Sequence, residues 1–341
     1  MNFIKLRPMI IREKVVSGIR STGFLHLGNY FGAIRNYVRM QGTYECYFFV
    51  ADIHSLTTHP KPENLRENVH RVLAENIASG LDPDQVALYA QSDLPETLEL
   101  YTYLNMIAYR GELEKTASFK EKVRLQPENV NAGLLTYPVL MAADILIHQA
   151  VKVPVGKDQE QHLEMTRNLA SRFNNRYGWL FPEPEAFNFG DGLVKIGSLD
   201  GQGKMSKSEN ELVTIYLSDP DDQIRRKIKR ALTDEGPKTP FAEKPGYIDN
   251  LFLLLKLVSQ PEIVAHFEEG YNQCHIRYGD LKEQLAKDMI SFISPIREKA
   301  RSIQSDTPYL ARIMKQGAEK AEISAQKTLR QARELIGIHY Y

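Results

Sequence analysis

The stretch SGIRSTGFLHLGNYFGA, residues 17–33, joins a short apolar strand to the first turn of a helix through a loop that contains Gly18 and Gly23. Backbone amides at the N-terminus of a helix attract phosphate, so this turn is a candidate anion site. His26 and Asn29 share one side of the expected first turn, where both could donate to phosphate oxygens. The stretch matches neither GxGxxG nor GxxxxGK[ST]. By itself, a capped helix with a solvated histidine explains it better.

Outward from this turn, strand-like runs alternate with amphipathic helices over the first two-thirds of the chain. Strands are predicted at 14–18, 46–54, 86–90 and 151–155, and helices at 64–80, 95–115 and 158–178. Another helix is expected to begin at Pro138, because proline suits a first helical position. This alternation is typical of an α/β fold, in which a parallel sheet carries helices on both faces.

Each predicted strand ends in polar residues. They are Ser17 and Arg20, Asp52 and His54, Gln91 and Ser92, and Asp158 and Gln159. In an open α/β sheet the carboxyl ends of the strands line the ligand crevice. Strands generally end in polar turns, so a single end carries little weight, but four together favour a site at this edge.

The composition changes after about residue 190. A glycine- and serine-rich connector, residues 195–210, is followed from residue 219 by one helical pattern after another. We therefore expect a first domain of residues 1–195 and a smaller all-helical domain of residues 209–341. The last helix, at about 309–336, is a candidate to pack back on the first domain.

The overall composition, 43% hydrophobic and 25% charged, is that of a soluble globular protein. No apolar run predicts a membrane span or a secretory signal. The two cysteines, Cys46 and Cys274, form no metal or redox motif, so a cytoplasmic location is expected. Lys plus Arg equals Asp plus Glu at 43 each, so a nucleic-acid partner needs a local basic patch. QIRRKIKRAL, residues 223–232, is a candidate, although a solvated helix face explains it equally well.

Two short motifs together resemble the paired signature of class I aminoacyl-tRNA synthetases: HLGN at 26–29 and KMSKS at 204–208. The first departs from the usual HxGH through Asn29, whereas the second matches letter for letter. YFFVADIH, GELEKTASFKEK, GLLTYPVLMAADIL and VPVGKDQEQHLEMTRNLASRFN extend the likeness, which is to the tryptophanyl-tRNA synthetase family. It implies a Rossmann-like parallel sheet in the catalytic domain and a helical domain that binds the anticodon.

The resemblance also implies that the loop at 201–208 closes over the triphosphate of ATP. Lys204 and Lys207 would meet the β- and γ-phosphates, and with His26 and Asn29 they form the implied catalytic set. The implied ATP-binding residues are Arg20, Ser21, Thr22, Gly28, Asn29, Gly156, Lys157, Asp158, Ile196, Lys204, Met205, Ser206, Lys207 and Ser208. Lys120 or Lys122 is a further candidate to contact pyrophosphate. Mg²⁺ would bind mainly through the phosphates, with no protein metal site.

This chain departs from the family pattern at two places in that set. Arg20, Ser21 and Thr22 stand where members often read Gln-Pro-Ser, and Lys157 stands where many have glutamate. The contacts of Arg20 and Lys157 are therefore left open.

The helix pattern at 136–150 carries a single carboxylate, Asp144, among apolar residues. From periodicity alone, Asp144 is better explained as a carboxylate that faces solvent or pairs with a lysine than as a functional group in an apolar pocket. The resemblance instead implies that Asp144 accepts the indole N–H of L-tryptophan. It further implies apolar walls from Met141, Val153 and Val155, an α-amino site at Tyr137 and Gln159, and His54 beside the pocket.

The implied activity is that of a tryptophan–tRNA ligase that forms tryptophanyl-adenylate and charges tRNA(Trp). The resemblance implies a homodimer, and the segment 98–113, which has more tyrosines and leucines than one face needs, agrees with that expectation. The alternatives are a tyrosyl-tRNA synthetase, a small-molecule nucleotidyltransferase and a non-catalytic tryptophan- or tRNA-binding regulator. Met141 before Asp144 favours indole over phenol, the helical domain disfavours the nucleotidyltransferase, and intact KMSKS lysines disfavour the regulator.

Overall fold

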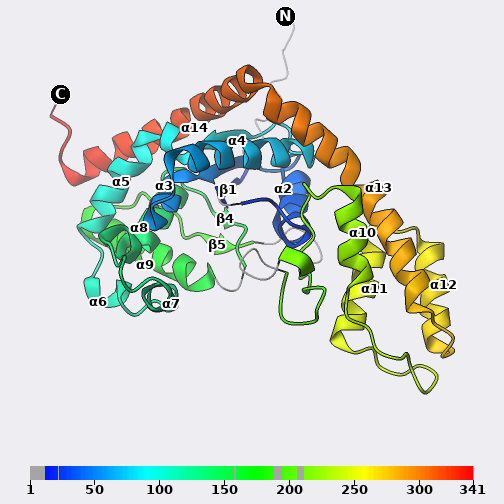
Figure 1. The fold of residues 1–341 in the computed structure, drawn as a ribbon. Coiled ribbons are helices and arrows are strands. Elements are labelled where there is room, and N and C mark those ends of the chain that lie inside the picture. The colour runs from blue at the N-terminus through cyan, green and yellow to red at the C-terminus, as the bar shows by residue number, and fades with distance from the viewer. Residues whose placement is uncertain (1–11, 22, 157–158, 188–193, 206–210, 341) are drawn as a thin grey trace, which may run out of the picture.

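The computed structural model describes residues 12–21, 23–156, 159–187, 194–205 and 211–340 (Figure 1). A parallel sheet of five strands, in the order β3-β2-β1-β4-β5, forms its centre. The strands are β1 Lys14–Arg20, β2 Glu45–Ala51, β3 Ala87–Ala90, β4 Lys152–Val153 and β5 Glu185–Ala186. The four predicted strands are all present, and β5 was not predicted.

The strand order fixes where a ligand crevice opens. The chain winds outward from β1 to β2 and β3, then returns to place β4 on the other side of β1. Such a reversal separates the loops that follow the two central strands and leaves a crevice at their carboxyl ends. Residues that follow β1 and β4 are therefore brought together at one edge.

Helices cover both faces of the sheet, which confirms the predicted fold class. One face, with Val16, Tyr47 and Phe49, packs on α5 (Pro95–Asn105), α8 (Ala132–Leu146) and α9 (Glu160–Tyr177). The opposite face, with Val15, Phe48 and Val50, packs on α2 (Arg35–Met40) and α4 (Pro62–Ala78). The alternation follows from the two-residue period of a strand, which sends neighbouring side chains to opposite faces.

The short elements of the first half are α1 Leu27–Asn29, the π-helix η1 Tyr30–Ile34, α3 Asp52–Ser55, η2 Leu56–Thr58, η3 Gln91–Asp93, α6 Arg110–Leu113 and α7 Ala117–Leu125. The second half contains η5 Glu211–Val213, α10 Asp221–Lys229, α11 Gly246–Val258, α12 Pro261–Asn272, α13 Tyr278–Ser305 and α14 Thr307–Ile336. Of the longer helices, α7 and α12 were not predicted. A separate core of α10, α11 and α13 also contains Leu25, Leu27 and Phe31, so the helical region and the turn after β1 share one interior. None of the described helices is long and apolar enough to cross a membrane.

The prediction that a helix begins at Pro138 was wrong. The helix α8 begins at Ala132, and Pro138 lies inside it. Asn131 caps the helix, since its Oδ1 accepts the N–H of Leu134 at 2.9 Å. An asparagine cap satisfies one of the free amides of the first turn, which is a stronger start signal than proline at a later position.

The long helix α14 leaves the helical region and lies along β3, the edge strand of the sheet (Figure 1). Gly317 makes the close approach possible, because a Cβ atom there would lie 2.0 Å from the carbonyl oxygen of Leu88. Lys320 Nζ donates to the carbonyl of Pro83 at 2.7 Å just before the strand. The helix thus covers an edge that would otherwise expose unpaired backbone groups.

Gly317→Ala should destabilise the protein by about 1–3 kcal/mol, the cost of forcing extra atoms into a packed interior. The matched control is Gly270→Ala in α12, where a Cβ atom would find its nearest neighbour at 3.9 Å. That change should instead add up to about 1 kcal/mol through helix propensity. Chemical unfolding of both variants checks this, and equal stability changes would contradict the close approach.

Candidate active site

The HLGN turn is held rigidly on two sides. His26 precedes α1, and its N–H donates to Asn29 Oδ1 at 3.1 Å. Backbone bonds pair the turn with the segment 215–217: Leu27 N–H donates to Ile215 at 3.0 Å, and Leu217 N–H donates to Leu25 at 2.8 Å. His26 is buried rather than solvated. Because the Asn29 oxygen closes the turn, its amide group is the part left to donate elsewhere.

The start of the KMSKS motif lies against this turn. Met205 N–H donates to the Ile196 carbonyl at 2.8 Å, within a tight turn in which Gly201 and Gly203 have φ of 75° and 80°. A Cβ atom on Gly28 would lie 2.9 Å from the His26 imidazole and 3.3 Å from the Met205 carbonyl oxygen. Glycine at position 28 therefore permits the contact between two motifs that are distant in the sequence.

The other implied ATP-binding residues are placed differently. Arg20 is exposed at the end of β1, and Gly156 follows β4. Ser21 is buried and shares a hydrogen bond of 2.7 Å with Ser55, while Ile196 is buried in the core of the helical region. Lys204 is exposed. Thr22, Lys157, Asp158, Ser206, Lys207 and Ser208 lie outside the described residues.

A second cation lies near Arg20. Lys122 of α7 places its Nζ 4.0 Å from the centroid of the Tyr137 ring. Partial burial lowers the pKa of Lys122, and the charge of Arg20 lowers it further. Two neighbouring cations at the carboxyl edge of the sheet favour binding of a polyanion. Which of Lys120 and Lys122 contacts pyrophosphate stays a prediction.

Asp144 is the centre of a buried polar cluster. Its Oδ2 lies 2.9 Å from His54 Nε2, and Gln91 Nε2 donates to Oδ1 at 2.8 Å and Oδ2 at 3.0 Å. Gln91 Oε1 in turn accepts the His54 N–H at 3.2 Å. Burial raises the pKa of Asp144, and the hydrogen bonds from His54 and Gln91 oppose that rise. The carboxylate faces neither solvent nor a lysine.

Gln91 is the functional residue that the sequence did not identify in this cluster. It appeared only as one of several polar residues at strand ends. Its partner is 53 residues away in the chain, and the two meet because β3 ends beside α8. A glutamine directly after a fully buried strand was the available signal.

The remaining implied pocket residues lie around Asp144. The Tyr137 ring centroid is 4.4 Å from that of His54 and 5.7 Å from that of His162. Gln159 Oε1 lies 2.9 Å from His162 Nδ1, which ties the start of α9 to the same group. Met141, Val153 and Val155 belong to the adjacent apolar core. The structure therefore links Asp144 to His54 and His54 to Tyr137, and Gln159 joins this group through His162. The roles of all seven residues in binding tryptophan stay predictions.

His148, one turn after Asp144, has a different environment. Its ring stacks on Tyr47 with centroids 4.0 Å apart, and its Nε2 lies 3.0 Å from the Tyr89 hydroxyl. Burial lowers the pKa of His148 to about 3, so the ring is neutral. This histidine packs the end of α8 against the sheet.

A doubly wound parallel sheet whose HLGN turn touches the start of a KMSKS motif defines a class I aminoacyl-tRNA synthetase. Comparison with known proteins agrees: the model of the family "tRNA synthetases class I (W and Y)" matches residues 12–294. The chain belongs to this family.

Relatives within the family are similar over nearly their whole length. The chain is 58% identical over 326 residues to a curated tryptophan–tRNA ligase of Porphyromonas gingivalis, covering 95% of this chain and 99% of the relative. It is 40% identical over 328 residues to that of Clostridium tetani, covering 96% of each. Among solved structures, tryptophanyl-tRNA synthetase of Campylobacter jejuni, complexed with ADP and tryptophan, superposes with a TM-score of 0.84 at 33% identity, covering 95% and 99% of the two chains.

Gln91→Met should lower the free energy of unfolding by an amount that depends on pH. The change removes the amide that donates to the buried carboxylate of Asp144, and the loss of a hydrogen bond to a charged acceptor costs about 1.5–3 kcal/mol. It also removes the amide oxygen that accepts the His54 N–H. The folded-state pKa of Asp144, already above 3.8 through burial, should rise further. Part of the lost unfolding free energy comes from the ionised carboxylate. That part is complete at pH values above the folded-state pKa of Asp144 in both the parent and the variant. It disappears at pH values below both, because a neutral carboxyl needs no such donor.

Chemical unfolding between pH 4.5 and 7.5, taken as a rough working range, measures this effect. Gln326→Met is the matched control, because Gln326 also donates to a carboxylate, that of Glu322, but on the surface of α14. The Gln326→Met variant should have nearly the same free energy of unfolding as the parent at every pH. If Gln91→Met lowers the free energy of unfolding by the same amount at every pH in this range, the Gln91 amide does not stabilise the ionised form of Asp144.

Proposed function

We propose that the protein is a tryptophan–tRNA ligase. It activates L-tryptophan with ATP to tryptophanyl-adenylate and pyrophosphate, then transfers tryptophan to the 3′ end of tRNA(Trp). The buried carboxylate of Asp144, held by His54 and Gln91 beside the Tyr137 ring, is the observation that carries this proposal. Similarity to tryptophan–tRNA ligases over nearly the whole chain supports it.

The cluster leaves room for one more donor at Asp144. A carboxylate offers about four acceptor positions. Among the described residues, Oδ2 is used by His54 and Gln91, whereas Oδ1 is used by Gln91 alone. We assign the remaining position on Oδ1 to the indole N–H, with Met141, Val153 and Val155 as apolar walls and Tyr137 and Gln159 near the α-amino group.

The activation step requires positioning and charge rather than a protein nucleophile. The tryptophan carboxylate oxygen forms a bond to the α-phosphorus of ATP as the bond to pyrophosphate breaks. We propose that Lys204, with Lys207, Arg20 and Lys122, stabilises the charge that develops on the leaving group. Gly28 and Asn29 bring backbone and amide donors to the same phosphates.

Magnesium fits this site as an ion carried by the nucleotide. The described residues contain no group of three or more metal-binding side chains, and Arg20, Lys122 and Lys204 bring positive charge to the phosphate region. Phosphate oxygens would therefore supply most ligands of Mg²⁺, which commonly keeps several waters.

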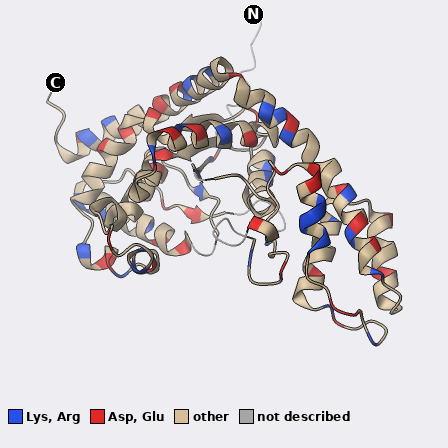
Figure 2. Ribbon diagram, in the orientation of Figure 1, with Lys and Arg blue, Asp and Glu red and all other residues tan. Residues whose placement is uncertain are grey.

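We propose a catalytic domain of residues 1–195 and a tRNA-binding helical domain of residues 209–341 in a cytoplasmic enzyme. The helix α10 supports the tRNA side, because Lys and Arg residues follow one another along it (Figure 2). Together with the residue that caps its C-terminus, it has four exposed basic residues. These are Arg225, Arg226, Lys229 and Arg230. Lys227 is not part of this surface: it is buried and donates to the Thr214 carbonyl at 2.8 Å and to Asp219 at 2.6 Å.

Amino-acid-dependent exchange of pyrophosphate into ATP, measured with each of the twenty amino acids, tests the function. Tryptophan alone should support exchange. Exchange with tyrosine instead would identify the tyrosyl alternative, and tryptophan binding without exchange would identify a regulator.

Lys204→Ala should lower the rate of adenylate formation by about 10²–10³-fold, the scale of losing one preorganised charge-stabilising donor. Tryptophan affinity should hardly change, because the lysine acts on the leaving group. Lys195→Ala, an exposed lysine shortly before the same turn, is the control and should keep the parent rate. Single-turnover kinetics separates the two effects. A higher Kd for tryptophan with an unchanged rate of adenylate formation would contradict a role of Lys204 at the leaving group.

Asp144→Ala should weaken tryptophan and reduce its advantage over phenylalanine. A substrate that lacks the indole N–H leaves a buried acceptor unpaired, at about 1–3 kcal/mol or more for a charge. The parent enzyme should therefore prefer tryptophan by several orders of magnitude in kcat/KM, as a rough expectation for a site built around a hydrogen bond. ATP affinity measured without amino acid should stay nearly intact. Full discrimination by the variant would make Asp144 a structural carboxylate.

We also propose a homodimer. Met106 is 75% exposed and Tyr109 61% exposed around the end of α5 and the start of α6, in the region expected to contact a second copy. Exposed apolar side chains that lie together favour a protein interface. Sedimentation should give twice the chain mass of 39.0 kDa, and a single chain at micromolar concentration would contradict the proposal.

A further inference from the structure

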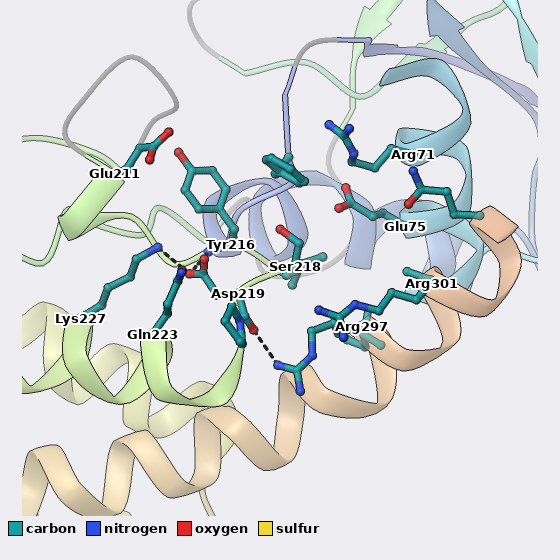
Figure 3. A pocket seen from close by; sticks show the side chains of 16 residues that line it. Arg71, Glu75, Glu211, Tyr216, Ser218, Asp219, Gln223, Lys227, Arg297 and Arg301 are labelled. Carbon is teal, nitrogen blue, oxygen red and sulfur yellow. Dashed lines mark hydrogen bonds and ion pairs between the residues drawn. The ribbon is translucent and has the colours of Figure 1, made fainter. Parts of the chain in front are cut away.

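A cavity of about 400 Å³ lies between α4, α13 and the segment that leads into α10 (Figure 3). It shares none of its lining residues with the Asp144 cluster. Pockets for small molecules usually have volumes of about 300–1,000 Å³. The size is therefore sufficient for a small organic ligand, and the side chains of the lining indicate which kind.

Two arginines one turn apart on α13 face this cavity (Figure 3). Arg297 is buried: its Nη1 donates to the Asp219 carbonyl at 2.6 Å and its Nη2 to Asp221 at 2.8 Å, while its Nε has no partner among the described residues. Arg301 is exposed, and no described residue forms an ion pair with it. Like charges at this spacing repel each other, so an anion between them would be stabilising. Guanidinium groups suit phosphate in particular.

The wall of the cavity also presents an aromatic surface. Phe24 is 42% exposed, with the guanidinium of Arg71 4.2 Å from its ring centroid and the Tyr216 ring edge-on at 6.1 Å. A flat ring could stack on the exposed part of Phe24, beside Arg71. Gln223, Gln304 and the exposed carboxylate of Glu211 line the same space and can bond hydroxyl or amino groups.

Apart from the exposed Glu211, the other charged groups of the lining have partners within the protein. Lys227 pairs with Asp219 at 2.6 Å, and Glu75 Oε2 accepts the Leu25 N–H at 3.0 Å. Arg71 pairs with Glu67. These groups shape the cavity, so the exposed Arg301 is the cation left to contact an anionic ligand, and the buried Arg297 adds positive charge beside it.

We propose that this cavity binds a nucleoside monophosphate or a molecule of the same chemistry, separately from the ATP site. Its phosphate would lie at Arg301, within reach of the positive charge of Arg297, with its base on Phe24 and its sugar hydroxyls toward Glu211. The wall residue Tyr216 belongs to the segment that pairs with the HLGN turn. A ligand here would therefore act on the amino-acid activation rate.

The test is a calorimetric titration of AMP, GMP, ribose 5-phosphate and inorganic phosphate into the full-length protein. The active site is first saturated with a sulfamoyl analogue of tryptophanyl-adenylate, whose own binding reports separately on the proposed function. We expect one nucleotide per chain, bound more tightly than ribose 5-phosphate or inorganic phosphate, since these lack the base.

Arg301→Ala should weaken nucleotide binding at least about tenfold, the loss of one hydrogen bond to a charged group, while Arg301→Lys should recover part of it. Lys299→Ala, an exposed cation on α13 outside the cavity, should bind like the parent. Absence of saturable binding, or equal binding by Arg301→Ala and the parent, would overturn the proposal. A loss of tRNA affinity alone in Arg301→Ala would also overturn it, in favour of contact with the RNA backbone.

Discussion

The rest of the active site depends on a short piece of backbone pairing between residues 25–27 and 215–217. Two hydrogen bonds, Leu27 to Ile215 at 3.0 Å and Leu217 to Leu25 at 2.8 Å, join the turn after β1 to the segment that follows the KMSKS motif. All four leucine and isoleucine side chains are buried in the core of α10, α11 and α13. The sheet and the helical region are therefore not independent bodies joined by a linker, because they share an interior at the position where the phosphates of ATP are expected.

This constraint explains why glycine stands at position 28. Once the turn is paired on one side, the start of the KMSKS motif can reach it only if the turn carries no side chain there. The calculated approach to Met205, 3.3 Å from a Cβ atom, leaves little room. A cation on the segment that contains Met205 is thus positioned relative to the turn by backbone atoms, which are less variable than side-chain rotamers. Such preorganisation is what stabilisation of developing charge requires.

The sequence predicted those parts of the fold that have a local signal. Apolar runs identified β1 to β4, and alternation with helices predicted a parallel sheet. The strand β5 has two residues, both exposed, and exists only because it pairs with β4, so periodicity had nothing to detect. The helix α8 was predicted with the wrong start because proline was weighed above the Asn131 cap. Lys227 was counted with the basic residues of α10, although its spacing from Ile224 already placed it beside the buried stripe.

Asp144 shows most clearly where local reasoning ends. Its neighbours in the sequence indicated an apolar helix, but the donors that hold it come from α3 and η3 and depend on the tertiary fold. A buried carboxylate with no donors would be very unstable, and one with every acceptor position filled would gain little from a ligand. The observed cluster lies between these limits, since His54 and Gln91 fill three positions and no other described residue fills the fourth, on Oδ1. A ligand N–H that reaches this position satisfies it, whereas a ligand without the N–H leaves a buried acceptor unpaired. An incompletely satisfied carboxylate therefore increases the difference in affinity between a ligand that carries the N–H and one that does not.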